Sequence, residues 1–215
     1  MNPESTFELF SEAESFGERP SIVLEQRCRA RGWTAVAGVD EAGRGSLCGP
    51  VVAAAVILPD DCLIDGVTDS KLLPPEKRTR LAVEIKRHAL AFATGSCSPD
   101  EIDRMNILRA ALEAMRRAVA ALRPPADFLL IDGNFCPAVD GTPARAVVKG
   151  DLRSHSIAAA SIIAKTTRDA WMAQLHEEYP LYGWDTNMGY ATPGHYLSLS
   201  RHGPTPHHRR SFRLS

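Results

Sequence analysis

The sequence lacks long apolar runs and any large excess of charge of one sign, and each absence excludes a class of protein. Its longest apolar stretches, Val51 to Leu58 and Ile157 to Ala164, fall far short of the ~20 residues that a membrane helix needs. Met1 to Phe10 lacks a basic segment followed by an apolar one, so we expect no secretory signal. A net charge of -1 over 215 residues gives no overall bias towards nucleic acid.

Cysteine is also scarce, and no two cysteines are spaced as Cys-x-x-Cys. An odd number without that spacing predicts reduced thiols, with neither a disulfide framework nor a zinc site, and favours a cytoplasmic protein. No Gly-x4-Gly-Lys-Ser/Thr motif follows a predicted strand, which argues against a nucleotide-binding switch. The five cysteines are Cys28, Cys48, Cys62, Cys97 and Cys136.

What is present is the composition of a soluble globular protein, 44% hydrophobic and 24% charged. The length suits one domain, and we find no internal repeat or low-complexity linker. Residues 1–33 read as a polar N-terminal lead-in, 34–215 as the main domain, and about 180–215 as a small C-terminal lobe. Thr186 to Ser215 contains four arginines and no acid, which fits either a phosphate contact or a solvated tail.

The first local signal is a pair of acids, Asp40 and Glu41, followed by the turn Gly43-Arg44-Gly45. The β-prone stretch Thr34 to Val39 and the apolar run Pro50 to Leu58 predict strands on either side, so we expect the acids on the turn between them. Strand side chains alternate between faces, and both acids can serve one site only if the strand stops or bends there. Glycines let a sugar or phosphate approach the backbone, although an ordinary acidic turn is the alternative for this pair alone.

Two further acids follow predicted strands. Asp132 ends the apolar segment Asp127 to Gly133, and Asp151 follows the short strand Arg145 to Val148. Acids at strand ends are where open α/β sheets hold ligands, while a strand-terminating turn is the alternative. Four converging carboxylates would repel each other unless divalent metal held them, and oxygen ligands favour Mg²⁺ or Mn²⁺. Two such ions ~4 Å apart would suit phosphodiester hydrolysis.

Three helices are predicted around these strands. One begins at Pro74-Pro75, where proline suits the first helical position. A capping box, Ser98 to Glu101, begins a second helix whose apolar stripe continues to Leu122. The third, Ser156 to Tyr179, begins with small residues that permit close approach to a sheet.

Several polar residues have more than one interpretation. The adjacent Arg168 and Asp169 predict an internal ion pair or a tie between helix and loop, in preference to a fifth metal ligand. The segment His207 to Arg210 predicts a phosphate-facing or structural loop in preference to a metal site. His155 and His195 are near Asp151 and Tyr190 in sequence and are placed at the border of the cleft, without a role in proton transfer.

From about Val36 to Phe212, an ordered set of motifs resembles bacterial ribonuclease HII, the type 2 ribonuclease H. No single motif is specific, but the order and spacing of the set are. The motifs are Asp40 to Gly45, Asp69-Ser70-Lys71, Ile131-Asp132-Gly133, Lys149-Gly150-Asp151, Ile157 to Lys165, Arg168-Asp169, Gly189-Tyr190 and His207 to Phe212.

The resemblance implies an α/β, ribonuclease H-like mixed five-stranded sheet flanked by helices, with a small helical C-terminal part. It implies an endonuclease that hydrolyses the RNA strand of RNA-DNA hybrids. Ribonucleotides embedded in duplex DNA would be cut on their 5′ side, leaving 3′-hydroxyl and 5′-phosphate ends, in ribonucleotide removal during DNA replication and repair.

The same resemblance implies residue roles. Two divalent ions, Mn²⁺ or Mg²⁺, would be held by the catalytic acids Asp40, Glu41, Asp132 and Asp151. The family's Gly-Arg-Gly would grip the ribonucleotide 2′-OH, a tyrosine would stack on the neighbouring deoxyribose, and two lysines would meet phosphates. These substrate-binding positions are Gly43, Arg44, Gly45, Tyr190, Lys71 and Lys165. One departure is Pro74, which stands where many relatives carry a capping serine.

Two other functions remain open at this level. A two-metal DNA nuclease of the same fold would cut DNA that lacks ribonucleotides. A non-catalytic hybrid-binding module, or a partner of the replication clamp, would bind without cutting. A monomer that makes no contact with membranes is the expected form.

Overall fold

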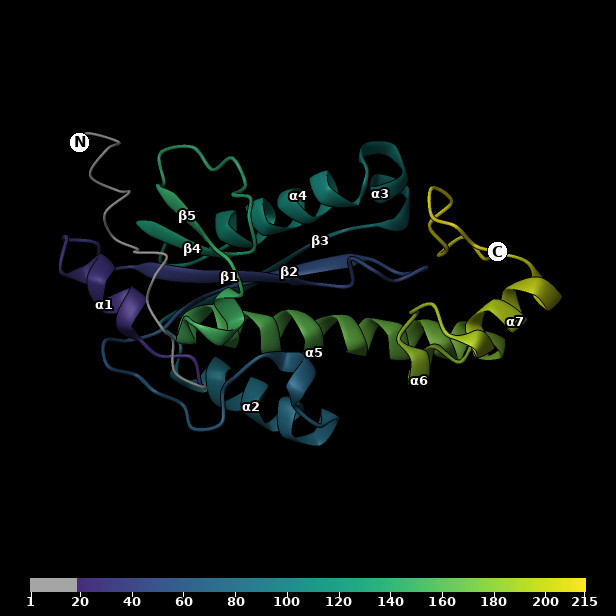
Figure 1. Cartoon of the computed structure of the whole chain (residues 1–215), viewed down its shortest axis with the longest axis horizontal. Helices are drawn as coiled ribbons and strands as arrows, with labels where there is room; N and C mark the ends of the chain where they lie inside the picture. The colour runs from purple at the N-terminus through teal and green to yellow at the C-terminus, as the bar shows by residue number, and fades with distance from the viewer. Residues whose placement is uncertain (1–18) are drawn as a thin grey trace.

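The sheet at the centre of the structure is built from the apolar runs of the sequence. The computed structural model describes residues 19–215, so residues 1–18 of the expected lead-in lie outside the described part (Figure 1). The strand order is β3-β2-β1-β4-β5, with β1 antiparallel to β2 and parallel to β4. The predicted mixed five-stranded sheet is therefore confirmed. Its strands are β1 Val36–Ala42, β2 Val51–Ile57, β3 Ala91–Cys97, β4 Phe128–Asp132 and β5 Ala144–Val147.

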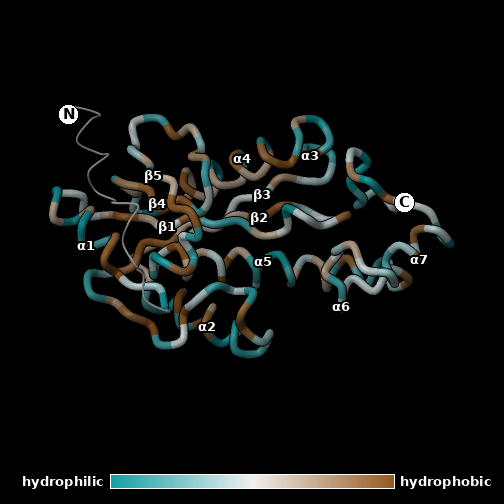
Figure 2. Tube along the Cα trace, in the orientation of Figure 1, coloured by the Kyte–Doolittle hydropathy of each residue, from teal (hydrophilic) through white to brown (hydrophobic). Residues whose placement is uncertain are grey.

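Helices cover both faces of the sheet (Figure 1). Helix α4 packs on one face, and α5 packs on the other with α2 beside it. Hydrophobic segments gather in the sheet and the helices against it, while many outer loops are hydrophilic (Figure 2). The helices are α1 Val23–Arg29, α2 Pro75–His88, α3 Pro99–Met105, α4 Ile107–Ala120, α5 His155–Glu178, α6 Trp184–Asn187 and α7 Pro193–His202.

The second predicted helix is wrong in one respect, because the structure divides it into α3 and α4. Ser98 and Glu101 form the predicted capping box at the start of α3. Asn106 then adopts a positive φ of 73° and caps α4 by accepting a hydrogen bond from the Arg109 N–H. Asparagine tolerates this conformation and competes for backbone hydrogen bonds, so it interrupts a stripe whose apolar spacing continues across it.

Helix α5 lies unusually close to β1. A Cβ added at Gly38 would lie 2.1 Å from the carbonyl carbon of Ser156, at the start of α5. The helix begins where Ser154 caps it, and Glu25 of α1 accepts hydrogen bonds from the Ser154 hydroxyl and the Ser156 N–H. Part of the expected lead-in thus helps to hold the N-terminus of α5.

The C-terminal elements pack around an apolar cluster of their own at the far end of α5 (Figure 1). Trp184 and Tyr182 are buried there with Met172 of α5 and Cys48 from the loop before β2. Short 3-10 helices complete the chain at Ser70–Leu72, Gly150–Leu152 and Pro180–Tyr182. Within residues 19–215, no helix combines the length and apolar character needed to cross a bilayer.

We predict that Gly38→Ala destabilises the protein by about 3 kcal/mol, because the new methyl group would overlap the backbone of α5. Thermal or denaturant unfolding measures this loss. Gly194→Ala is the matched control, since Gly194 lies in α7 with nothing within 4 Å of an added Cβ. Equal stability of the two variants would show that α5 can move away from β1 at little cost.

Candidate active site

Asp40 and Glu41 lie inside β1 and not on a turn, so the expected position of these acids is wrong. The strand continues to Ala42 because β2 pairs with it throughout, with Asp40 opposite Ala54 and Glu41 opposite Ala53. Alternation along the strand places Asp40 on the same side as Gly38, which faces α5, and Glu41 on the other side. The two acids therefore diverge at the backbone.

Three aspartates meet at one end of the sheet. Asp40 of β1, Asp132 at the end of β4 and Asp151 in the 3-10 helix after β5 each offer an oxygen within 4.8 Å of the others. The N–H of Gly150 donates to Asp132 Oδ1 at 2.6 Å, which ties the end of β4 to the segment carrying Asp151. Strands β1, β4 and β5 are mutually parallel, so their carboxyl ends bring these acids together as the strand-end pattern predicts.

The aspartates are held where ionisation is unfavourable. Asp40 is 4% exposed, and burial, followed by the charges of Glu41 and Asp132, raises its pKa well above the usual range. Burial and the neighbouring charges of Asp132 and Asp69 raise the pKa of Asp151 to about 6. Burial also raises the pKa of Asp132, against the hydrogen bond from Gly150. A compact set of oxygen donors whose negative charge is only partly offset, by Lys71 at 3.9 Å from Asp151, fits hard divalent cations.

Glu41 is not one of the three converging acids. Its Oε1 accepts a hydrogen bond from Arg44 Nη1 at 3.1 Å. Its charge nevertheless acts on Asp40 and Asp132, raising the pKa of both. Glu41 thus borders the aspartate cluster and ties it to the glycine-rich loop.

A pocket of about 590 Å³ opens beside these acids. Glu41 and Ser161 form part of its wall, and every residue predicted to bind substrate also lines it. Sequence reasoning did not assign the other polar lining residues, Ser70, Arg78 and Ser161, although Ser161 is the one polar residue inside the buried run Ile157 to Ala164. The predicted substrate residues in the wall are Gly43, Arg44, Gly45, Lys71, Lys165 and Tyr190.

The predicted lysines differ in how firmly they are held. The Lys71 side chain is 77% exposed, with Nζ 3.9 Å from Asp151 Oδ2. Lys165 Nζ lies 2.6 Å from Asp169 Oδ1 and 5.6 Å from the centre of the Tyr190 ring. Asp169 Oδ2 also pairs with Arg78 at 3.3 Å. Lys165 is thus fixed beside Tyr190, while Lys71 extends over the acids.

Arg168 acts as a tie between helix and loop, which is one of its two predicted roles. It donates to the backbone carbonyls of Cys48, Pro50 and Met188 at 2.9–3.1 Å. The predicted internal ion pair is found at Asp169, whose carboxylate pairs with Lys165 and Arg78.

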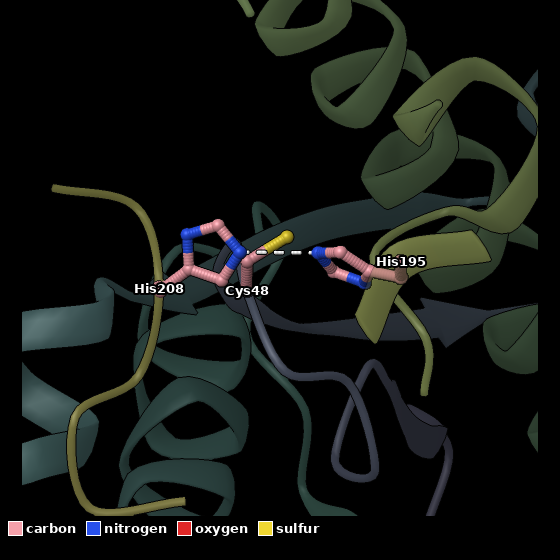
Figure 3. A group of neighbouring side chains, drawn as sticks. All are labelled: Cys48, His195 and His208. Atoms are coloured by element: carbon pink, nitrogen blue, oxygen red, sulfur yellow. Dashed lines mark hydrogen bonds between the residues drawn. The ribbon is translucent and has the colours of Figure 1, made fainter. Parts of the chain in front are cut away.

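His195 and His208 are buried and are not among the residues that line the pocket. Figure 3 shows their rings joined by a hydrogen bond, beside Cys48. His195 Nε2 lies 3.1 Å from His208 Nε2, with Cys48 beside them, a group with the spacing of a metal site. The partners assign the tautomers: His195 Nδ1 donates to the Tyr190 carbonyl, and the Thr205 N–H donates to His208 Nδ1.

His208 Nε2 therefore carries its proton and donates to His195 Nε2, which also accepts from Trp184 Nε1. A metal bound between these nitrogens would displace both donors, so the group fits a hydrogen-bonded chain and not a metal centre. The structural interpretation of the His207 to Arg210 loop is confirmed for its buried residues, His208 and Arg209. His155 is buried too and accepts from the Ile64 N–H, so the expected place of His155 and His195 at the cleft border is wrong.

Comparisons of the sequence with known proteins agree on one family. Residues 37–215 match the sequence model of the family Ribonuclease HII. A protein named Ribonuclease HII from Salinibacter ruber (strain DSM 13855 / M31) is 55% identical over 193 residues, covering 88% of this chain and 96% of that protein. Another Ribonuclease HII, from Dechloromonas aromatica (strain RCB), is 56% identical over 177 residues, covering 82% and 90%.

Two solved structures resemble the fold closely. The ribonuclease H2 from Pyrococcus horikoshii OT3 superposes with a TM-score of 0.70 at 28% identity, covering 83% of this chain and 94% of that one. The ribonuclease HII in a complex with PCNA from Archaeoglobus fulgidus gives the same score and identity, covering 84% and 96%.

We predict that Asp151→Asn stabilises the protein in chelator at pH 8 by on the order of 1–3 kcal/mol. The pKa of Asp151 is raised in the folded state to about 6 from 3.8. The folded state therefore holds the proton more tightly than the unfolded state does. The ionised Asp151 lowers the free energy of unfolding by its full amount above pH 6, and this loss disappears as the pH falls towards 4. Melting temperatures measured from pH 4 to pH 8 should show the gain shrink with falling pH.

The exposed Asp140→Asn serves as the control, and it should change little at any pH. Added Mn²⁺ or Mg²⁺ should stabilise the wild-type protein more than Asp151→Asn. If the stability gain of Asp151→Asn did not depend on pH, or if the ions stabilised this variant as much as the wild type, the gain could not come from the aspartate cluster.

Proposed function

The chain belongs to the ribonuclease HII family and is a ribonuclease H, an endonuclease that hydrolyses RNA; beyond this we propose that it cuts on the 5′ side of ribonucleotides embedded in duplex DNA. The products would carry 3′-hydroxyl and 5′-phosphate ends. The RNA strand of longer RNA-DNA hybrids is the other proposed substrate.

One observation carries this proposal. The pocket lined by Gly43, Arg44, Gly45, Lys71, Lys165 and Tyr190 adjoins the aspartate cluster through Glu41. A sugar in the pocket would therefore have its neighbouring phosphate near the acids. Residues from separate motifs share one recess, which favours a single site for recognition and cleavage.

We propose Asp40, Glu41, Asp132 and Asp151 as the catalytic acids that hold two divalent ions, Mg²⁺ or Mn²⁺. When bound, such ions polarise the scissile phosphate and lower the pKa of the attacking water. Three of the acids already offer convergent oxygens. Glu41 would exchange its hydrogen bond with Arg44 for the site, since the two are joined in the structure.

The chain's own residues would select the substrate. The turn Gly43 to Gly45 brings backbone to the pocket wall, and an added Cβ at Gly45 would meet nothing within 4 Å, so a sugar 2′-OH can approach the backbone closely there. Tyr190 would stack on the next deoxyribose, with its ring orientation held by the Lys165 and Arg168 cations. Lys71 and Lys165 would contact phosphates, because their ammonium groups border the same recess.

The setting of this activity is also part of the proposal. The five cysteines are all free in the structure, which suits the reducing cytoplasm. A monomer is sufficient, because the acids and the pocket come from one chain. Residues 34–215 would form the catalytic domain. A replication-clamp contact is proposed by likeness to the Archaeoglobus fulgidus protein, whose complex contains PCNA.

The decisive test is cleavage of an end-labelled duplex containing one ribonucleotide, with Mn²⁺, Mg²⁺ or chelator, beside an all-DNA duplex. We expect metal-dependent cutting at the 5′ side of the ribonucleotide alone. Asp40→Asn should lower turnover by roughly a thousandfold or more while leaving duplex affinity within about threefold, since it removes a metal ligand and not a nucleic-acid contact.

Each other outcome points to a specific alternative. Equal cutting of both duplexes would favour a general two-metal DNA nuclease of the same fold. Binding without cutting would favour a non-catalytic module.

A second prediction concerns the tyrosine. Tyr190→Phe should keep cleavage at the single ribonucleotide within about threefold, because the ring is retained, whereas Tyr190→Ala should lower kcat/KM by roughly ten- to a hundredfold, the value of one stacking contact. Parallel assays on a long RNA-DNA hybrid measure whether the loss is specific to a deoxyribose neighbour. A wild-type kcat/KM for Tyr190→Ala would show that the ring does not stack on the substrate.

A further inference from the structure

Two arginines lie fully buried beneath the proposed substrate pocket. Arg168 and Arg209 are each 0% exposed. Within residues 19–215, neither side chain forms an ion pair, and every hydrogen bond they make goes to a backbone carbonyl. Burying a charge without an opposite charge beside it costs stability, so the presence of two such guanidinium groups close together suggests a functional role.

The positive charges of Arg168 and Arg209 also repel each other. Burial lowers the pKa of Arg209 to about 9, and the nearby positive charge of Arg168 adds to this effect. Burial lowers the pKa of Arg168 as well. The fold thus concentrates positive charge under the pocket at a cost to stability, the pattern expected where an anionic ligand binds above it.

Arg209 holds the glycine-rich turn in one orientation. Its guanidinium donates to the carbonyls of Gly43 at 2.7 Å, Arg44 at 3.0 Å and Gly49 at 3.0 Å. In a trans peptide the N–H points opposite to the carbonyl of the same unit. The N–H groups of Arg44 and Gly45 therefore point away from Arg209, and neither donates to another described residue.

Arg168 supports the same turn and the opposite wall. A Cβ at Gly43 would lie 2.0 Å from Arg168 Nε, so the turn rests directly on this side chain. The guanidinium carbon lies 5.4 Å from the centre of the Tyr190 ring, and Arg168 also donates to the carbonyl of Met188, two residues before that tyrosine. One side chain thus positions both the turn and the stacking ring.

We propose that Arg168 and Arg209 are positioning residues for substrate recognition: they turn the Gly43 and Arg44 carbonyls inward, so that the N–H groups of Arg44 and Gly45 meet an oxygen of the ribonucleotide's sugar-phosphate. Neither arginine touches substrate. The inference rests on the proposed function, because it assigns a role to the same pocket.

The test compares Arg209→Lys and Arg168→Lys with the wild type. Lysine keeps the positive charge but cannot donate to three carbonyls from a rigid plane. We expect KM for the single-ribonucleotide duplex to rise roughly tenfold or more, the value of two misplaced hydrogen bonds, with kcat within about threefold. Mn²⁺ affinity, measured by calorimetry, should stay unchanged, which separates this effect from damage to the acids.

Arg117→Lys is a control for the loss of a guanidinium: Arg117 also donates to a backbone carbonyl, that of Ser96, but it is partly exposed, pairs with Glu101 and Glu113, and lies away from the pocket. It should lose stability without a rise in KM. A wild-type KM in either folded pocket variant, or an equal rise in Arg117→Lys, would overturn the proposal. Failure of the wild type to cut the ribonucleotide duplex would instead reject the proposed function.

A second measurement uses no arginine variant, so it can be made even if Arg168→Lys and Arg209→Lys do not fold. In Asp40→Asn, which should bind without cutting, amide spectra are recorded with the single-ribonucleotide duplex and with the all-DNA duplex. The N–H signals of Arg44 and Gly45 should move further with the ribonucleotide, as expected for new hydrogen bonds. Duplex binding that leaves both signals in place would overturn the proposal.

Discussion

The repulsion among Asp40, Asp132 and Asp151 is the constraint around which the rest of the molecule is arranged. Burial and like charge both oppose ionisation of these groups, yet their oxygens stay within 4.8 Å of one another. They stay there because each is attached to the carboxyl end of one of three adjacent parallel strands, or to the turn after it. The rigid sheet thus holds together carboxylates that would move apart if they were on flexible segments.

The position of α5 follows from that sheet. Gly38 allows the start of the helix to press against β1, two residues before Asp40, and the small residues of its first turns continue the contact. From there α5 extends past the pocket, with Lys165 in its wall and the buried Arg168 under the glycine-rich turn. One helix therefore connects the packing of the core, the wall of the pocket and the support beneath it.

Acidic and basic groups are concentrated on different sides of the pocket, and the Glu41–Arg44 and Lys71–Asp151 contacts join the two sides. Acids occupy the strand ends, whereas the two buried arginines lie under the glycine-rich turn and Tyr190. Behind them, the chain of His195, His208 and Trp184 fixes the carbonyl of Tyr190. The convergent oxygens of the acids thus border the region proposed to hold the phosphate backbone, as cleavage of a phosphodiester bond would require.

The sequence by itself determined the strands, the capping box that begins α3, and the acids at strand ends, because burial period, capping and turn chemistry act over a few residues. It also contained the family's motifs in order. Only the tertiary structure decided that Asp40 and Glu41 diverge within a strand, since the length of β1 depends on pairing with β2. The same holds for Arg168 and Arg209, whose carbonyl partners come from segments up to 166 residues away. A charged residue in a polar tail has no local signal of burial, because the groups that enclose it are brought together by the fold alone.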